Sequence, residues 1–359
     1  MGHLPIVNQS TVTDVIRDGH ISTRGDLKEM WEKTTADIFS DVLATRAGDL
    51  VFPWIIAGAG EQNIGFKYIL TITGPPIFVE GDEYPVKVPL SQEGWEFPNP
   101  LPEATALDLW DSRLLWNAIG KKSLRRGRSL THQTPMEDQR LLQLLNSINP
   151  SGPRKITLGK KSYGGTPITI NTSQTYWDQR LKEKLGSLSP YNRLSALDLN
   201  GIPWRRGQSF IVEKALEAWI MENIDKDPGK EFRENVLDAS SKIEWFGNYL
   251  PFGVAGGNMD VVVTQSSDSR RFITVIELKV TSLRMKEFRE VAHQVSMYCE
   301  FIRNAFKAYG EIIEPNGIVI SGPSSDFGPS TSISEKASIK WVAYSINDKG
   351  DVHFTPILH

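Results

Sequence analysis

Cysteine is nearly absent from this sequence, which has a single one, Cys299, among 359 residues. One cysteine excludes an intramolecular disulfide and every zinc site that is built from several cysteines. The sequence also lacks an apolar run long enough to span a membrane, and residues 1–10 lack the apolar core of a signal peptide. These absences predict a cytoplasmic protein that has no membrane partner.

A large excess of charge of either sign is absent too, because the formal net charge is only −3. Any affinity for nucleic acid must therefore come from local groups of basic residues. Hydrophobic residues make up 40% and charged residues 23% of the chain, which is typical of globular proteins. The length predicts two domains of ordinary size rather than one.

The clearest break in the sequence is a cluster of helix-stopping and turn-forming residues, Asn149-Pro150-Ser151-Gly152-Pro153. We therefore predict a first domain over residues 1–150 and a second domain over residues 208–359. Residues 151–207 form a connector that the sequence does not assign to either domain.

The first domain has the pattern of a helix, a group of strands and a closing helix. Apolar spacing predicts helices over residues 26–39 and 135–148. Thr134 is the expected cap of the second helix, and Pro135 stands at its first position, where the missing N–H costs nothing. The expected strands lie over residues 49–56, 65–72, 77–80 and 84–90, and their Gly/Pro-rich punctuation suits a strongly curved sheet.

The second domain alternates between helix and strand. We expect helices over residues 211–224 and 285–308, two strands that end at Val263 and Val280, and further strands over residues 317–321 and 340–345. In the connector, residues 167–172 favour a strand and residues 174–185 favour a helix. The order of the second domain is typical of an α/β fold.

Two segments of the second domain carry the most chemical information. Asp260 opens the apolar run Val261-Val262-Val263, and a second apolar run leads into Glu277-Leu278-Lys279. Alternate residues of a strand point to one face, so Glu277 and Lys279 project together, and a hairpin would bring Asp260 to them. Two carboxylates form a hard-oxygen site for Mg²⁺, with an ammonium beside it. The competing interpretation is a solvated, charged strand end, because this spacing also occurs by chance.

The flanking helices add carboxylates and polar groups on single faces. Glu213 and Glu217 are one turn apart on the helix before the strands, and Gln294 and Tyr298 are one turn apart on the helix after them. Each pair alone is an ordinary feature of a solvated or amphipathic helix. The complete order of helix, strand, strand and helix, each with its polar residues, is much less expected by chance.

That order resembles the PD-(D/E)xK nuclease superfamily, in the branch that has a RecB-like Gln-x-x-x-Tyr helix. The resemblance covers roughly residues 208–305, and Glu213-Lys214-Ala215-Leu216-Glu217 with the two strand segments is similar to the C-terminal domain of archaeal NucS-type nucleases. It implies a restriction-endonuclease-like α/β domain, with a central mixed sheet flanked by helices. One departure is Met259, because no proline precedes Asp260.

The resemblance also implies a metal site. Asp260, Glu277 and the backbone carbonyl of Leu278 would ligate one Mg²⁺ or Mn²⁺. Glu213 would complete this site or help to hold a second ion, and it aligns with the family's helix better than Glu217 does.

The remaining residues of the motif would act on the water and the phosphate. Lys279 would orient the water or stabilise negative charge, and the sequence leaves open whether it also acts as a base. Gln294 would hold the water or the lysine, and Tyr298 would pack over a phosphate.

The first domain resembles the PUA-like group that includes EVE and YTH domains, over about residues 10–148. The similarity is strongest from Ile72-Thr73-Gly74-Pro75-Pro76 through residues 84–88. It implies an α+β curved-sheet domain that holds an extruded, often modified, base in an aromatic pocket.

The candidate pocket walls are Trp54, Trp95, Trp110 and Trp116, and the candidate phosphate contacts are Lys121, Lys122, Arg125, Arg126 and Arg128. The competing interpretations are core tryptophans and a solvated basic face.

Together, these features predict a Mg²⁺-dependent endonuclease that hydrolyses phosphodiester bonds of double-stranded DNA. The first domain would read a modified base, as in modification-dependent restriction. One alternative is a NucS-like repair nuclease for mismatched or branched DNA, and another is a nucleic-acid-binding protein whose nuclease fold is inactive. Cleavage of both strands with one site per chain would favour a homodimer.

Overall fold

The protein is a mixed α/β protein that forms two compact units, and each is described here by itself. The computed structural model describes residues 1–24, 33–57, 64–102, 104–105, 130–170, 172, 205–206, 208–210, 213–251, 257–267, 270–307, 312–323 and 339–358. Unit 1 comprises Met1–Asp26 and Asp37–Ile168, and unit 2 comprises Leu27–Ala36 and Thr169–His359. The division after Ile168 lies inside the connector that the sequence left unassigned. Within these ranges, no helix is long and apolar enough to cross a membrane.

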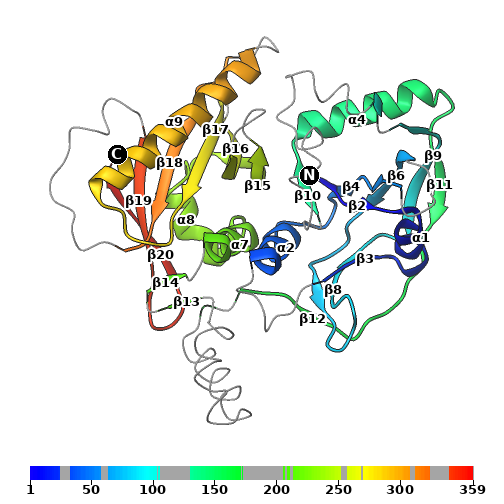
Figure 1. Ribbon diagram of the computed structural model, residues 1–359, viewed down its shortest axis with the longest axis horizontal. Coiled ribbons are helices and arrows are strands. Elements are labelled where there is room, and N and C mark those ends of the chain that lie inside the picture. Colours follow the sequence, from blue (N-terminus) through cyan, green and yellow to red (C-terminus); the bar gives the residue numbers. More distant parts are fainter. Residues whose placement is uncertain are drawn as a thin grey trace. The chain divides into compact units, whose positions relative to one another are not determined.

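Unit 1 is built on a curled, mixed sheet that forms a half-barrel (Figure 1). Its strands are β1 (Gly2–Leu4), β2 (Ile6–Val7), β3 (His20–Thr23), β4 (Leu50–Val51), β5 (Trp54–Ile55), β6 (Gly65–Thr71), β7 (Ile77–Phe78), β8 (Val86–Pro89), β9 (Glu93–Leu101), β10 (Thr131–Gln133), β11 (Arg154–Thr157) and β12 (Thr166–Pro167). The order in the large sheet is β10-β1-β4-β6-β5-β2, with β9 paired to β6 and β11 paired to β9. A smaller sheet has the order β12-β7-β8-β3.

The described residues of unit 1 include the helices α1 (Gln9–Asp18), α4 (Pro135–Ile148) and the part of α2 (Lys33–Leu43) from Asp37 onward. The α4 helix has the predicted bounds and the predicted cap. Thr134 Oγ1 accepts the Glu137 N–H at 3.3 Å, and Glu137 Oε2 accepts the Thr134 N–H at 2.7 Å, so two backbone donors are satisfied in a capping box.

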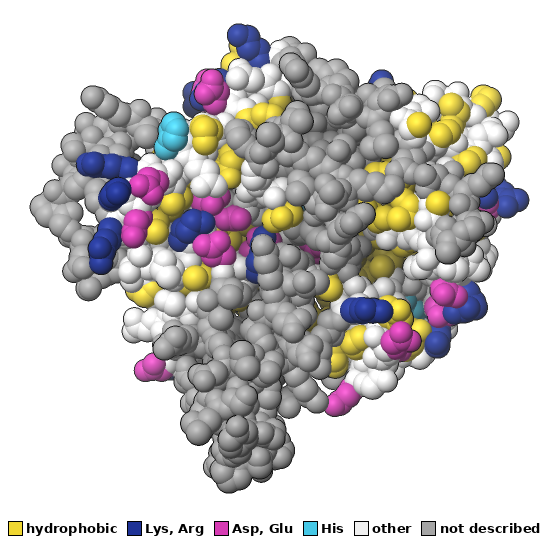
Figure 2. Space-filling view, viewed as in Figure 1, with side chains coloured by type: hydrophobic (Ala, Val, Ile, Leu, Met, Phe, Trp, Pro, Cys, Tyr) yellow, Lys and Arg dark blue, Asp and Glu magenta, His cyan; other side chains and the backbone are white. Residues whose placement is uncertain are grey.

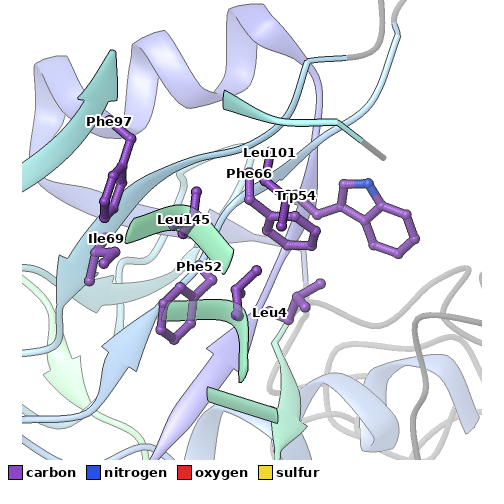
Figure 3. Packing of buried hydrophobic residues seen from close by; sticks show 9 residues of the cluster. Leu4, Phe52, Trp54, Phe66, Ile69, Phe97, Leu101 and Leu145 are labelled. Carbon is purple, nitrogen blue, oxygen red and sulfur yellow. The ribbon is translucent and has the colours of Figure 1, made fainter. Parts of the chain in front are cut away.

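One face of α4 supplies Leu141 and Leu145 to the core of unit 1, where both side chains are fully buried. Figure 3 shows this core, in which side chains from the first strand, the central strands and α4 meet. Its other members are Leu4, Phe52, Trp54, Phe66, Ile69, Phe97 and Leu101. Contact between residues this far apart in sequence fixes the curl of the sheet around one apolar centre.

Unit 2 is built on a six-stranded mixed sheet with the order β15-β16-β17-β18-β19-β20 (Figure 1). The strands are β15 (Lys242–Pro251), β16 (Asn258–Ser267), β17 (Arg270–Leu278), β18 (Asn316–Ser321), β19 (Ile339–Ile346) and β20 (Val352–Leu358), and a separate pair is β13 (Arg205–Arg206) and β14 (Ser209–Phe210). Pairing is parallel for β17-β18-β19 and antiparallel elsewhere in this sheet. The helical elements are α7 (Glu213–Asn223), η2 (Asp227–Gly229), α8 (Lys230–Asn235) and α9 (Met285–Lys307).

Helices cover both faces of this sheet. Phe288 of α9 stacks on Trp341 of β19 with ring centroids 4.3 Å apart. On the other face, Trp219 of α7 and Phe232 of α8 pack against Phe354 of β20. Phe354 pairs with Tyr344 of β19. Tyr344 and Trp341 are an odd number of positions apart on that strand, so their side chains point to opposite faces of the sheet.

A glycine sets how closely α9 approaches the sheet. A Cβ atom on Gly317 of β18 would lie 2.7 Å from Val295 Cγ1 and 3.3 Å from Cys299 Sγ, closer than ordinary van der Waals contact. Only glycine therefore lets α9 pack at this distance without a shift. The close packing holds α9, and with it Gln294, against the end of β17.

Candidate functional site

The predicted hairpin of the second domain is confirmed by the pairing of β16 with β17. Val261 pairs with Ile276 in antiparallel register, which leaves Asp260 across from Glu277 at the end of the ladder. The Leu278 N–H donates to Asp260 Oδ2 at 2.9 Å, so a side-chain oxygen takes the place of the next backbone acceptor. The strand ends thus bring the two carboxylates together, as the sequence pattern predicts.

Lys279 connects the carboxylates of this site. Its Nζ lies 3.0 Å from Glu277 Oε1 and 3.3 Å from Glu213 Oε1, and it donates to the Leu278 carbonyl at 2.8 Å. Burial lowers the pKa of Lys279, but the charges of Glu277, Asp260 and Glu213 outweigh this effect and raise it above its ordinary value. The lysine is therefore a stable cation in this site.

The face of α9 that carries Gln294 and Tyr298 supports Glu277. Gln294 Nε2 donates to Glu277 Oε1 at 3.2 Å and also contacts the Tyr298 hydroxyl. That hydroxyl donates to the Asn258 carbonyl at 3.2 Å, and Tyr298 is only 2% exposed. The chain of contacts ties the helix to the start of β16, two residues before Asp260. Tyr298 therefore presents its hydroxyl to the site and does not offer an exposed ring face.

Glu277 is the buried centre of the site. Its side chain is 4% exposed, and Oε2 is buried without a hydrogen-bond partner. Burial raises the pKa of Glu277 despite the opposing effect of Lys279. Burial and the charge of Glu277 likewise raise the pKa of Asp260 well above its ordinary value. The neighbouring ammonium therefore does not fully offset the cost of burying these two carboxylates together.

Glu217, the alternative helix carboxylate, belongs to a second group of residues beside Asp260, and the sequence does not predict its partner from β15. Glu217 is 1% exposed, accepts Asn248 Nδ2 at 2.6 Å and contacts the Lys214 ammonium. Lys214 in turn lies 4.5 Å from the ring centroid of Tyr249. The helical spacing of Lys214 and Glu217 is visible in the sequence, but β15, which supplies Asn248 and Tyr249, is not predicted. Glu217 is thus bound internally, whereas Glu213 reaches Lys279.

The charges of this region leave room for a cation. The described residues that contribute are four carboxylates and two ammonium groups: Asp260, Glu277, Glu213, Glu217, Lys279 and Lys214. One divalent cation would neutralise the remaining two negative charges, and the unpartnered Glu277 Oε2 offers it a ligand. No three His, Cys, Asp or Glu side chains in the described ranges form a ready metal site. Among the described residues, Asp260 and Glu277 are two carboxylates that face each other across the β16-β17 ladder and could serve as side-chain ligands.

The tryptophans proposed as base contacts lie in different settings. Trp54 is fully buried and stacks on Phe66 with centroids 5.8 Å apart, at the margin of the core cluster (Figure 3). Trp95 on β9 is 43% exposed and pairs across the strands with Lys155, which is also exposed. Trp110 and Trp116 lie outside the described residues, as does the whole basic run Lys121, Lys122, Arg125, Arg126 and Arg128.

Several basic side chains described in unit 1 are already paired with acids. Glu96 contacts both Lys67 and Arg154, and Lys155 contacts Glu93. On the face drawn in Figure 2, acidic and basic side chains likewise lie next to one another.

The comparisons with known proteins do not add a relative. No family model, no curated protein and no solved structure matches the chain. The interpretation of this site therefore depends on its own geometry.

Proposed function

We propose that this protein is a metal-dependent endodeoxyribonuclease whose unit 2 has a restriction-endonuclease-like fold of the PD-(D/E)xK type. The observation that carries the proposal is the meeting of Asp260, Glu277 and Lys279 at one sheet end, with Gln294 bonded to the same carboxylate. In a salt bridge with a purely structural role, each buried carboxylate oxygen would have a hydrogen-bond or ionic partner. Here a buried carboxylate oxygen is left without a partner and the pKa values of both acids are raised.

The residues fit a divalent cation of the Mg²⁺ or Mn²⁺ class, held by Asp260 and Glu277. The Leu278 carbonyl, which accepts from Lys279, has a second lone pair for the same purpose. When bound, such a cation supplies Lewis acidity toward the phosphate and the attacking water.

The protein's own residues supply orientation and charge. Lys279 stays protonated, so its ammonium would donate to a phosphate oxygen as negative charge grows there, rather than remove a proton. Glu213 holds this ammonium from the solvent side, since its carboxylate is 44% exposed. Gln294 fixes the rotamer of Glu277. The arrangement is suited to hydrolysis of a phosphodiester, because it combines two candidate metal ligands with a protonated lysine beside them.

The test is cleavage of plasmid DNA by the purified protein with Mg²⁺ or Mn²⁺. Wild type is expected to cut, and Lys279→Ala is expected to lose cleavage while it keeps its affinity for DNA. Lys226→Ala is the control, because Lys226 also pairs with a buried carboxylate, that of Glu222 at 3.9 Å, which is not one of the proposed site residues. Equal cleavage by wild type and Lys279→Ala would show that the site is elsewhere.

We propose further that unit 1 is a PUA-like reader that directs cleavage to DNA with modified bases. The exposed Trp95 supports contact with nucleic acid, since an exposed aromatic face is a surface on which a base can stack. The measurement is cleavage of unmodified, cytosine-modified and mismatched duplexes side by side. Preference for modified DNA that weakens in Trp95→Ala is expected. Preference for the mismatched duplex would favour a repair nuclease instead, and equal cutting of all three would contradict both.

A further inference from the structure

Lys214 is a charged residue that the proposed reaction does not use. It follows Glu213 on α7, its side chain is only 13% exposed, and its ammonium contacts the carboxylate of Glu217. The ammonium also lies 4.5 Å from the ring centroid of Tyr249. A lysine in this setting is fixed in place, unlike a surface lysine that moves freely in solvent.

Tyr249 brings Lys214 next to Asp260. In the β15-β16 ladder, Asn248 pairs with Val261 and Leu250 pairs with Met259, so Tyr249 occupies the position across from Asp260. Its φ is 55°, the one positive φ at a non-glycine residue in the described ranges. A left-handed backbone is unfavourable for an aromatic residue and persists only where the surroundings hold it. Tyr249 thus links Lys214 to Asp260, because its ring contacts the Lys214 ammonium and its backbone lies across the ladder from Asp260.

Glu217 is closed to a metal ion by its existing contacts. One oxygen accepts the Asn248 amide at 2.6 Å, the other contacts Lys214, and the side chain is 1% exposed. The charges of Lys214 and Glu217 still act on Asp260, where the first lowers and the second raises its pKa, each less than burial and Glu277 raise it. This pair therefore belongs to the electrostatic surroundings of the site without offering it a ligand.

We propose that this site binds a single divalent cation, and that the Lys214 ammonium takes the place beside Asp260 that a second cation would otherwise fill. The inference rests on the proposed function, because it concerns the metal that the reaction uses. Only two negative charges are uncompensated in this region, and one divalent ion removes them. A second ion would need carboxylates that are already engaged, Glu217 by Lys214 and Glu213 by Lys279. No third free acid converges there among the described residues.

The number of ions is measured by Mn²⁺ titration of the full-length protein in a calorimeter, with electron paramagnetic resonance to detect coupled ions. Wild type is expected to bind one Mn²⁺ without spin coupling, and Asp260→Asn is expected to lose it. Two ions that both require Asp260 would overturn this inference but leave the proposed function standing. Absence of any Asp260-dependent ion would overturn the proposed function and this inference together.

Variants test the part that Lys214 plays. Lys214→Ala leaves Glu217 as an uncompensated carboxylate near Asp260, so the number of bound ions should rise from one to two. Lys214→Ala combined with Glu217→Gln removes both charges and should return the number to one. The control Lys226→Ala, which releases Glu222 instead, should keep one ion.

The outcomes are decisive even where a variant is unstable. A folded Lys214→Ala that binds one ion would contradict the role given to Lys214. If Lys214→Ala does not fold, Lys214→Gln takes its place, because the neutral amide can still donate to Glu217. Two ions in Lys214→Gln support the role given to Lys214, one ion contradicts it, and two ions in wild type overturn the proposal.

Discussion

Replacement of Asp260 by asparagine is expected to stabilise the metal-free protein even as it abolishes cleavage. Asp260 lies across from Glu277 at the end of the β16-β17 ladder, and side chains in directly opposite positions are roughly 5 Å apart. Two like charges at that distance repel by about 3 kcal/mol at an effective dielectric constant near 20. Lys279 and Lys214 offset part of this repulsion. We therefore expect the free energy of unfolding to rise by about 1–2 kcal/mol.

The sign of this effect depends on pH. Because the pKa of Asp260 is raised in the folded protein, the folded state binds this proton more tightly than the unfolded state does. The resulting stability is fully present below pH of about 4, the ordinary pKa of an aspartate. It is lost as pH rises through the higher pKa of the folded state. Asparagine does not ionise, so the difference in free energy of unfolding between variant and wild type should grow as the pH rises from the ordinary to the raised pKa of Asp260.

Thermal unfolding in the presence of a chelator, from mildly acidic to mildly alkaline pH, measures the difference. A gain of this size corresponds to a rise of roughly 2–8 °C in the Tm of a unit of this size. The asparagine carbonyl can still accept the Leu278 N–H, so that contact is not lost. A variant less stable than wild type at neutral pH would refute the idea that the two carboxylates repel each other.

A substitution in the same unit, Asp238→Asn, serves as a control that should change stability in the opposite direction. Hydrogen bonds from Ser240 and Ser241 lower the pKa of Asp238, so its charged form is favoured by folding. Asp238→Asn should therefore destabilise the protein at neutral pH, whereas Asp260→Asn stabilises it. Two identical substitutions with opposite effects would separate electrostatics at the site from a general effect of removing a carboxylate.

Three further results are expected. Mg²⁺ or Mn²⁺ should raise the Tm of wild type but not of Glu277→Gln in scanning calorimetry, since a ligand at about 100 times its Kd adds about 2.7 kcal/mol. Gln294→Leu should lower the initial rate of DNA cleavage about tenfold, because a hydrogen bond to a charged group contributes about 1.5 kcal/mol. Its circular dichroism spectrum should be unchanged. An unchanged rate would contradict the role of Gln294 in holding Glu277. Thr134→Ala should reduce the stability of unit 1 by about 1 kcal/mol in urea titration through loss of the α4 cap, and no change would show that the cap is dispensable.

The elements that could be predicted have local signals. The α4 helix has a capping threonine, a proline at its first position and a regular apolar face, and its predicted bounds match the structure. The α7 and α9 helices and the β16-β17 hairpin also lie where their periodicity indicates. The α1 helix is missed, although Asn8 and Gly19 cap it, because its many β-branched and polar residues hide the helical period.

The β15 strand is the main element that the sequence does not reveal. Its pairing with β16 shifts register between Ile243 and Trp245, and Tyr249 near its end has a left-handed backbone. Both features break the alternation that marks a strand. The strand is formed by pairing with its neighbour rather than by its own pattern, so its contribution to the site is invisible without the structure.

The candidate site likewise contains some residues that local sequence patterns predict and others that depend on contacts between distant segments. Asp260, Glu277 and Lys279 are predictable because they lie at strand ends with the correct alternation. Gln294 could be singled out only through the resemblance of its helix to a RecB-like Gln-x-x-x-Tyr helix. The Lys214, Glu217 and Asn248 group depends on a contact between residues 31 positions apart. No local pattern specifies such a contact. Glu213 and Glu217 differ by a single turn, and only the packing of α7 gives them separate partners.

Asp260, Glu277 and Lys279 are proposed to act together as a metal-dependent phosphodiesterase site. Residues that act as one unit have non-additive effects. The most direct test is therefore the rate of Mg²⁺- or Mn²⁺-dependent cleavage by Asp260→Ala, by Lys279→Ala and by the variant with both changes. Each single change is expected to lower the rate to the same background, and the double change is expected to lower it no further. Cleavage that survives either single change, or losses that multiply in the double variant, would contradict this proposal.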